Sequence, residues 1–167
     1  MILRSCLALY MLFSMIVLTA CSTQLPLPMQ EPVLQDVQLP LQLHLRYQEA
    51  DISRDALMVI QREAATLRFS LFDAMGVPQA RQILRDSSWH ADGLLPPHPH
   101  ARQWFAGVLF ALTDAQYLQQ QYPSASVSKQ QRALANGWQV LHSEPGQWQI
   151  IFNPQQTLHI EQMEWQP

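Results

Sequence analysis

Alternation of apolar and polar residues with a period of two is the feature that most constrains the fold of this chain. From Leu39 to Tyr47, leucine or tyrosine occupies every second position, and proline, glutamine, histidine and arginine lie between them. Successive side chains of a β-strand point to opposite faces of the sheet, so this pattern predicts a strand with one buried face. Such a strand needs partners, and the rest of the chain must supply them.

The same alternation returns along most of the sequence. Four more strands are predicted within the first 91 residues, at 56–62, 65–71, 77–84 and 87–91, with a turn at 73–76. The C-terminal strands are predicted at 127–134, 138–142, 148–152 and 157–165. The dipeptides Asn136-Gly137, Pro145-Gly146 and Asn153-Pro154 separate them, and Asn-Gly is a strong hairpin signal.

One segment breaks this pattern with a helical period. Residues 101–112 place large apolar side chains at positions i, i+1, i+4, i+5 and i+8, which lie on one face of a helix: Trp104, Phe105, Val108, Leu109 and Leu112. Prolines between 94 and 100 exclude regular structure just before it. A short second helix is expected over 114–121, with Thr113 as N-cap and Pro123 after its end. The sequence therefore predicts a mainly antiparallel β fold with a helical insertion (α+β), in which a curved sheet packs its concave side on the helix.

Length and composition fit one domain with a sizeable core. The chain has 167 residues, of which 48% are hydrophobic and only 14% charged. Its formal net charge is −3, and removal of residues 1–20 takes away Arg4 and no acid, which gives 9 − 13 = −4. A weakly acidic chain with a single lysine, Lys129, lacks the basic surface that nucleic acid or an anionic membrane requires.

The N-terminal segment predicts export and lipidation. Arg4 precedes an apolar run over 7–18, which is short for a membrane span and ends in small residues. The sequence Leu18-Thr19-Ala20-Cys21 resembles the lipobox of bacterial lipoproteins, which implies a signal peptide over 1–20, cleavage between Ala20 and Cys21, and a diacylglycerol and acyl lipid such as palmitate on Cys21. The alternative is an uncleaved N-terminal anchor helix. Ser22, by resemblance to sorting in Gram-negative bacteria, implies an outer-membrane anchor facing the periplasm, and several acyl chains make such an anchor stable.

The segment after the cysteine is rich in proline. Pro26, Pro28 and Pro32 favour extended chain, so residues 21–38 are expected to form a tether and residues 39–167 the domain. An edge strand over 33–39 is the alternative. Cys6 lies in the signal, so the mature chain has one cysteine and no intrachain disulfide.

Three stretches between Ala56 and Trp165 resemble the lipoprotein-receptor family typified by LolB. They are Leu67-Arg68-Phe69-Ser70-Leu71 with Asp73-Ala74-Met75-Gly76, then Leu95-Pro96 with Arg102-Gln103-Trp104-Phe105-Ala106-Gly107, and Asn136-Gly137-Trp138-Gln139-Val140 with Leu158-x-Ile160 and Trp165. The N-terminal half is shorter than in LolB. The chain looks more like a related group of small lipoproteins of unknown function that accompany genes for aryl-polyene lipid synthesis.

The resemblance implies an open, curved β half-barrel, like those of LolB and LolA, whose hollow accepts acyl chains under a helical lid. The implied cavity residues are Trp104, Phe105, Val108, Leu109, Leu112, Phe69, Leu71 and Trp138. Ordinary core packing is the alternative for all of them. The implied partners are outer-membrane lipid, lipid or lipoprotein cargo and a LolA-like periplasmic carrier, and the protein is expected to be a monomer.

Met75 is expected at a loop tip, where the resembled family carries a protruding leucine. Either it inserts into a membrane or meets a carrier, or it folds back onto the sheet. His98 and His100, near His90, raise the question of a metal. With no cysteine or paired acid beside them, we expect a solvent-facing loop and no metal.

No Gly-x-Ser-x-Gly elbow and no free cysteine accompany these features, so the chain is not expected to be an enzyme or to need a cofactor beyond its covalent lipid. Two functions remain open. The first is a lipoprotein that binds acyl chains or lipidated cargo in its hollow and assists their localisation or insertion at the outer membrane. The second is a non-catalytic assembly lipoprotein that docks a protein partner.

Overall fold

The structure is a computed structural model, which describes residues 25–96 and 98–163. The predictions about the signal peptide, Ala20 and Cys21, and about the C-terminal end of the last strand at Trp165, lie outside these residues. No helix among the described residues has the length and apolar character of a membrane span.

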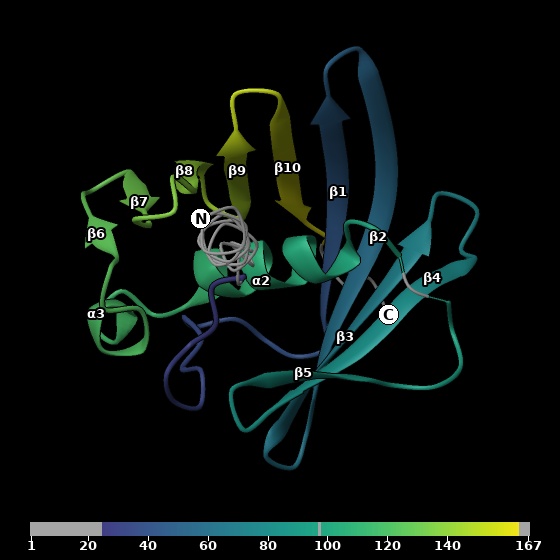
Figure 1. Cartoon of the computed structure of the whole chain (residues 1–167), viewed down its shortest axis with the longest axis horizontal. Coiled ribbons are helices and arrows are strands. Elements are labelled where there is room, and N and C mark those ends of the chain that lie inside the picture. Colours follow the sequence, from purple (N-terminus) through teal and green to yellow (C-terminus); the bar gives the residue numbers. More distant parts are fainter. Residues whose placement is uncertain (1–24, 97, 164–167) are drawn as a thin grey trace, which may run out of the picture.

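One ten-stranded antiparallel sheet forms the body of the molecule (Figure 1). Its strands follow the order β5-β4-β3-β2-β1-β10-β9-β8-β7-β6, and β5 and β6 are not paired with each other. The bounds are β1 Leu41–Glu49, β2 Ile52–Glu63, β3 Thr66–Asp73, β4 Pro78–Arg85, β5 Ser88–Ala91, β6 Ser126–Val127, β7 Gln131–Ala133, β8 Gln139–Glu144, β9 Gln147–Asn153 and β10 Gln156–Gln162. The predicted mainly antiparallel β fold with a helical insertion is confirmed.

The period-two pattern of the first strand gives it a buried and an outer face. Leu43, Leu45 and Tyr47 are almost completely buried, whereas His44 and Arg46 point away from the core. β1 lies at the centre of the sheet, between β2 and β10, so this buried face becomes the middle of the core.

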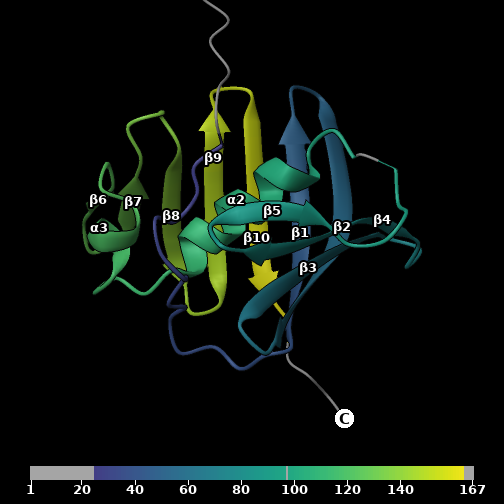
Figure 2. The same ribbon diagram turned by 60° about the horizontal axis from the view of Figure 1, so that its bottom comes forward.

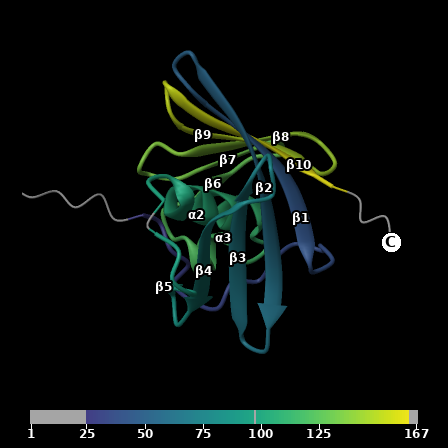
Figure 3. The same cartoon turned by 90° about the vertical axis from the view of Figure 1, so that its right-hand side faces the viewer.

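Helix α2 (Ala101–Leu112) has the bounds that its apolar spacing predicts. The sheet curves around it, so that α2 lies on the concave side (Figures 2 and 3). The helix is buried on nearly every face, because side chains from β1, β3, β5 and β9 surround it. Gly107 lies close to the sheet: a Cβ placed there would lie 2.9 Å from Cε1 of Phe152.

The described part of the expected tether does not extend freely away from the domain. Residues 25–38 pack along the domain, because Leu25, Leu27, Leu34 and Val37 cover apolar core surface. Their backbone also bonds to α2 and the segment after it: Gln35 N–H donates to the carbonyl of Leu112 at 2.8 Å. The alternative, an edge strand over 33–39, is not formed either: the segment makes a single β-bridge, between Leu34 and Thr113. Figures 1 and 2 show this segment in purple, beside α2.

Two other predictions are wrong in detail. The strand expected at 127–134 is divided into β6 and β7, because Ser128 and its neighbours form a turn closed by a bond from Ser128 N–H to the Gln131 carbonyl. The second helix is only α3 (Leu118–Gln121), and its N-cap is Tyr117. Thr113 instead ends α2, where its hydroxyl donates to the carbonyl of Leu109 at 2.8 Å.

Candidate functional site

The side chains predicted to line a hollow come together around α2. All eight are buried in one core cluster: Trp104, Phe105, Val108, Leu109, Leu112, Phe69, Leu71 and Trp138. They come from α2, from β3, and from the turn before β8. Tertiary structure therefore unites residues that the sequence separates by up to 69 positions, since Phe69 and Trp138 belong to the same cluster.

Aromatic rings fix the N-terminal half of α2 against two strands. The ring of Phe105 lies 5.5 Å from that of Phe69 on β3 and 5.9 Å from that of Trp89 on β5, measured between centroids. Phe69 and Trp89 meet edge to face at 5.1 Å. Tilted and edge-to-face pairs at these separations contribute favourable quadrupole interactions beyond the area they bury.

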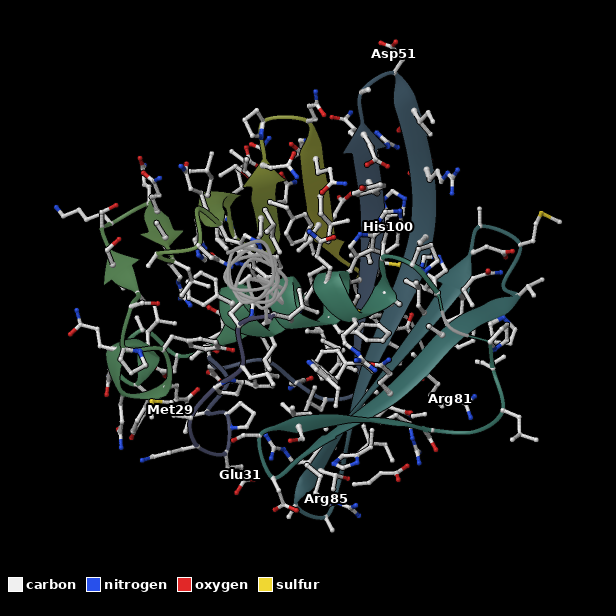
Figure 4. The ribbon with its side chains drawn as sticks, viewed as in Figure 1. Met29, Glu31, Asp51, Arg81, Arg85 and His100 are labelled. Atoms are coloured by element: carbon white, nitrogen blue, oxygen red, sulfur yellow. The ribbon has the colours of Figure 1, made fainter. Side chains whose placement is uncertain are left out.

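Three more rings surround Trp104 where α2 begins. Its indole lies 4.9 Å from the ring of Tyr47, 5.5 Å from that of His98, and 6.0 Å from that of His100, on which it stacks at 12°. Figure 4 shows His100 above the beginning of the helix. Burial, and next the charge of Glu49, raise the pKa of Tyr47 to about 12, so its phenol stays protonated at neutral pH.

The sequence analysis expected His98 and His100 in a solvent-facing loop. They do lie in the irregular segment before α2, but both are half-buried. His98 is half-buried, and its Nδ1 accepts hydrogen bonds from the backbone N–H groups of His100 at 3.3 Å and Ala101 at 3.1 Å. Burial lowers the pKa of His98, and the neighbouring His100 lowers it further. A neutral imidazole is therefore favoured, and it caps the first turn of α2.

A buried arginine holds the other end of the helix. Arg132 on β7 is only 6% exposed, and its Nη1 donates to the carbonyls of Phe110, at 3.3 Å, and of Thr113. Its guanidinium therefore meets carbonyl groups that the last turn of a helix leaves without partners, at the negative end of the helix dipole. Burial lowers the pKa of Arg132, and the charge of Asp114 opposes that shift.

In this structure the eight side chains pack as core. Neither of the two described pockets, of about 580 and 290 Å³, is lined by any of them. The smaller pocket lies between the N-terminal segment and the turns at the lower end of the sheet in Figure 4, where Glu31 and Arg85 are labelled.

Met75 lies in the turn between β3 and β4 and is 87% exposed. The alternative in which it folds back onto the sheet is therefore wrong. The carboxylate of Asp73 accepts hydrogen bonds from the N–H groups of Met75 and Val77, both at 2.9 Å, and Gly76 adopts a positive φ of 78°. This tight turn presents Met75 and the half-exposed Val77 to solvent, on the side of the molecule where α2 begins (Figures 1 and 2).

The larger pocket lies on the outer face of the sheet, which is the face turned away from α2. It takes residues from β1, β8, β9 and β10, and from the residue before β7. Its lining is His44, Arg46, Gln130, Leu141, His142, Ser143, Gln147, Trp148, Gln149, His159, Ile160 and Glu161. Sequence reasoning missed this site, although the polar positions of each alternating strand were visible, because pairing between strands decides which of them meet.

Among residues 25–96 and 98–163, no three histidine, cysteine, aspartate or glutamate side chains form a group that could hold a metal. Comparison of the sequence with protein-family models finds no matching family, and comparison with curated proteins finds no matching protein.

Proposed function

We propose that this protein is an exported lipoprotein of LolB-like type, anchored to the outer membrane through Cys21, that binds an acyl chain on the concave side of its sheet. The observation that carries the proposal is the packing of α2: an apolar helix lies inside an open sheet whose terminal strands, β5 and β6, do not pair. An acyl chain needs such a surface, since its transfer from water requires apolar area and no hydrogen bonds.

Contacts along α2 are suited to exchange. The side chains between its ends meet the sheet through apolar and aromatic contacts, whereas the polar ties to the rest of the protein lie at its two ends, at His98 and at Arg132. Apolar contacts are not directional. If α2 moves outward, an acyl chain takes the place of Phe105, Val108 and Leu109 against the sheet, and much of the lost apolar contact is recovered.

The beginning of α2 offers a polar end to such a ligand. The indole N–H of Trp104 is buried and has no hydrogen-bond partner within the described residues, a property that it shares with Trp89 and Trp148. Buried donors of this kind are uncommon in proteins. In the proposal this group donates to the ester or amide carbonyl of the cargo, and the chain itself extends toward Leu109 and Leu112.

Met75 supplies the exit in this proposal. A large apolar side chain at an exposed turn is suited to contact a membrane or an apolar surface on a carrier. The chain between Cys21 and the folded part is also short. Only residues 22–24 separate Cys21 from Leu25, and four residues span at most about 14 Å of extended chain. The lipid anchor therefore holds the domain close to the membrane.

Quenching by a brominated fatty acid tests the proposal on the full-length protein. Bound near Trp104, a dibrominated stearate should quench part of the tryptophan fluorescence, and Trp104→Phe should remove that part. Trp148→Phe is the comparison variant, because Trp148 is also buried in the core but its ring packs on His142 of β8 and not on the rings around Trp104. Lipid extraction and mass spectrometry of the purified wild type should also find acyl species that are not linked to Cys21. The proposal fails if no saturable quenching is observed and the extract contains no acyl species of this kind.

The close packing of the core favours a second candidate. Phe105, Val108 and Leu109 are completely buried in the present arrangement, as in a domain that has no ligand cavity. A protein of that kind would act as an assembly lipoprotein that docks a partner through its surface. The negative result of the fatty-acid experiment, together with an unchanged fold, would favour this candidate.

A further inference from the structure

Strand register brings residues from four neighbouring strands together in the outer pocket. Arg46 lies opposite His159, His159 opposite Gln149, and Gln149 opposite Leu141, so these four form one row across the outer face. A second row places His44 opposite Glu161 and Glu161 opposite Gln147. The two rows are adjacent, because their positions alternate along each strand.

Most polar groups in the pocket are free of protein partners. Within residues 25–96 and 98–163, no side-chain hydrogen bond is made by Gln147, Gln149, His159 or Glu161, nor by His142, Ser143 and Gln130 beside them. Gln147, Gln149 and His159 are nevertheless partly buried. The volume of about 580 Å³ falls in the range of small-molecule sites.

The walls of the pocket are held in place on one side. Asp55 Oδ1 accepts from Nε of Arg46 at 3.0 Å and lies 3.0 Å from Nε2 of His44. The bond from Arg46 lowers the pKa of Asp55, so this carboxylate stays charged at neutral pH.

Charge decides which class of ligand fits. Asp55 already balances Arg46, and Glu161 faces the pocket as a further negative charge. An anion would meet Glu161, and a cation would meet Arg46. The amide and hydroxyl groups of the pocket both donate and accept hydrogen bonds, and a neutral imidazole offers one donor and one acceptor nitrogen. Such groups suit a neutral ligand with many hydroxyl groups.

We propose that the outer pocket binds a neutral saccharide, with the amides of Gln147 and Gln149 and the imidazole of His159 as its hydrogen-bonding groups. The site lies on the face of the sheet opposite α2, so it is separate from the acyl site proposed above. A lipoprotein with both sites would hold the acyl chain of one molecule and the sugar of another at the same time.

Saturation-transfer NMR tests this assignment on the full-length protein, in lauryldimethylamine oxide because that detergent carries no sugar. The probes are maltose, cellobiose and N,N′-diacetylchitobiose, which differ in ring linkage and in the N-acetyl group. At least one should receive saturation from the protein. Gln149→Ala and His159→Ala should each weaken its binding about fivefold, the cost of one hydrogen bond.

Gln48→Ala is the matched control, because Gln48 lies on the outer face of β1 but does not line the pocket. It should leave binding unchanged, and all variants should keep the melting temperature of the wild type. The proposal is overturned if none of the three probes receives saturation, or if the Gln149→Ala and His159→Ala variants bind as the wild type does. Loss of the saccharide signal on addition of inorganic phosphate would overturn it in favour of an anion site.

Discussion

The imidazole of His98 accepts a hydrogen bond from the backbone N–H of Ala101 at 3.1 Å and so caps the first turn of α2. Only a neutral ring nitrogen accepts such a bond. A protonated His98 would lose it and would place a positive charge at the positive end of the helix dipole.

Stability should therefore fall in mildly acidic solution. The folded state lowers the pKa of His98 below its ordinary value of 6.5, so the unfolded chain binds the proton more readily. The contribution of His98 is complete above pH 6.5 and is lost as the pH falls through the lowered value. The free energy of unfolding, measured with urea at several pH values, should show this loss in the wild type.

His98→Asn separates the cap from the titration. An asparagine oxygen accepts from N–H groups two and three residues ahead without binding a proton, so this variant should lose less stability between pH 6.5 and 5. The pKa of His142 is also lowered, by burial and then by the charge of Arg132. Its titration therefore adds the same pH dependence of stability to both proteins. Equal pH dependence in the variant and the wild type would contradict the assigned role of His98.

Arg132→Met should destabilise the protein by about 2 kcal/mol. The substitution keeps an apolar side chain but removes the charged hydrogen bonds to the carbonyls of Phe110 and Thr113. Urea unfolding at pH 7 measures the change. Arg102→Met on α2 is the control, because Arg102 is exposed, and it should change stability by no more than about 0.5 kcal/mol.

Gly107→Ala should also destabilise the protein, by about 1 kcal/mol. Alanine gains about 1 kcal/mol of helix propensity, but its Cβ would lie 2.9 Å from Cε1 of Phe152 and 3.2 Å from Cδ1 of Ile150. The ring of Phe152 is held edge to face against Trp138 at 4.8 Å, so overpacking of about 1–3 kcal/mol outweighs the gain.

A double-mutant cycle checks this contact. In the background of Phe152→Leu, the smaller side chain should relieve the clash, and Gly107→Ala should then become neutral or stabilising. The same destabilisation in both backgrounds would mean that Gly107 is required for a reason other than its approach to Phe152.

Met75→Glu should slow the transfer of a fluorescent acyl cargo from the protein to phospholipid vesicles and leave stability within about 0.5 kcal/mol of the wild type, since the side chain is exposed. A charged group at the turn would have to leave water to enter an apolar surface. Met29→Glu is the matched control, because Met29 is also exposed, at 67%, but lies in the N-terminal segment (Figure 4). Equal transfer rates in all three proteins would exclude the role proposed for Met75.

The sequence by itself determined the local elements. Alternation in β1 and the helical spacing from Trp104 to Leu112 depend on neighbours a few residues apart, so the strand, the helix and the Asn136-Gly137 turn were predictable. It also determined that Trp104 and Phe105 share the face of a helix that must be covered.

Only the tertiary structure decided what covers that face and what meets across the sheet. Pro28 and Pro32 indicated a segment without regular helix, but could not show that its leucines pack on the core, because that contact joins distant parts of the chain. Likewise, His98 caps the beginning of α2 and Arg132 donates hydrogen bonds at its end, through partners that local spacing does not specify. Strand register, fixed by the whole sheet, brought His159 beside Gln149 and created the outer pocket.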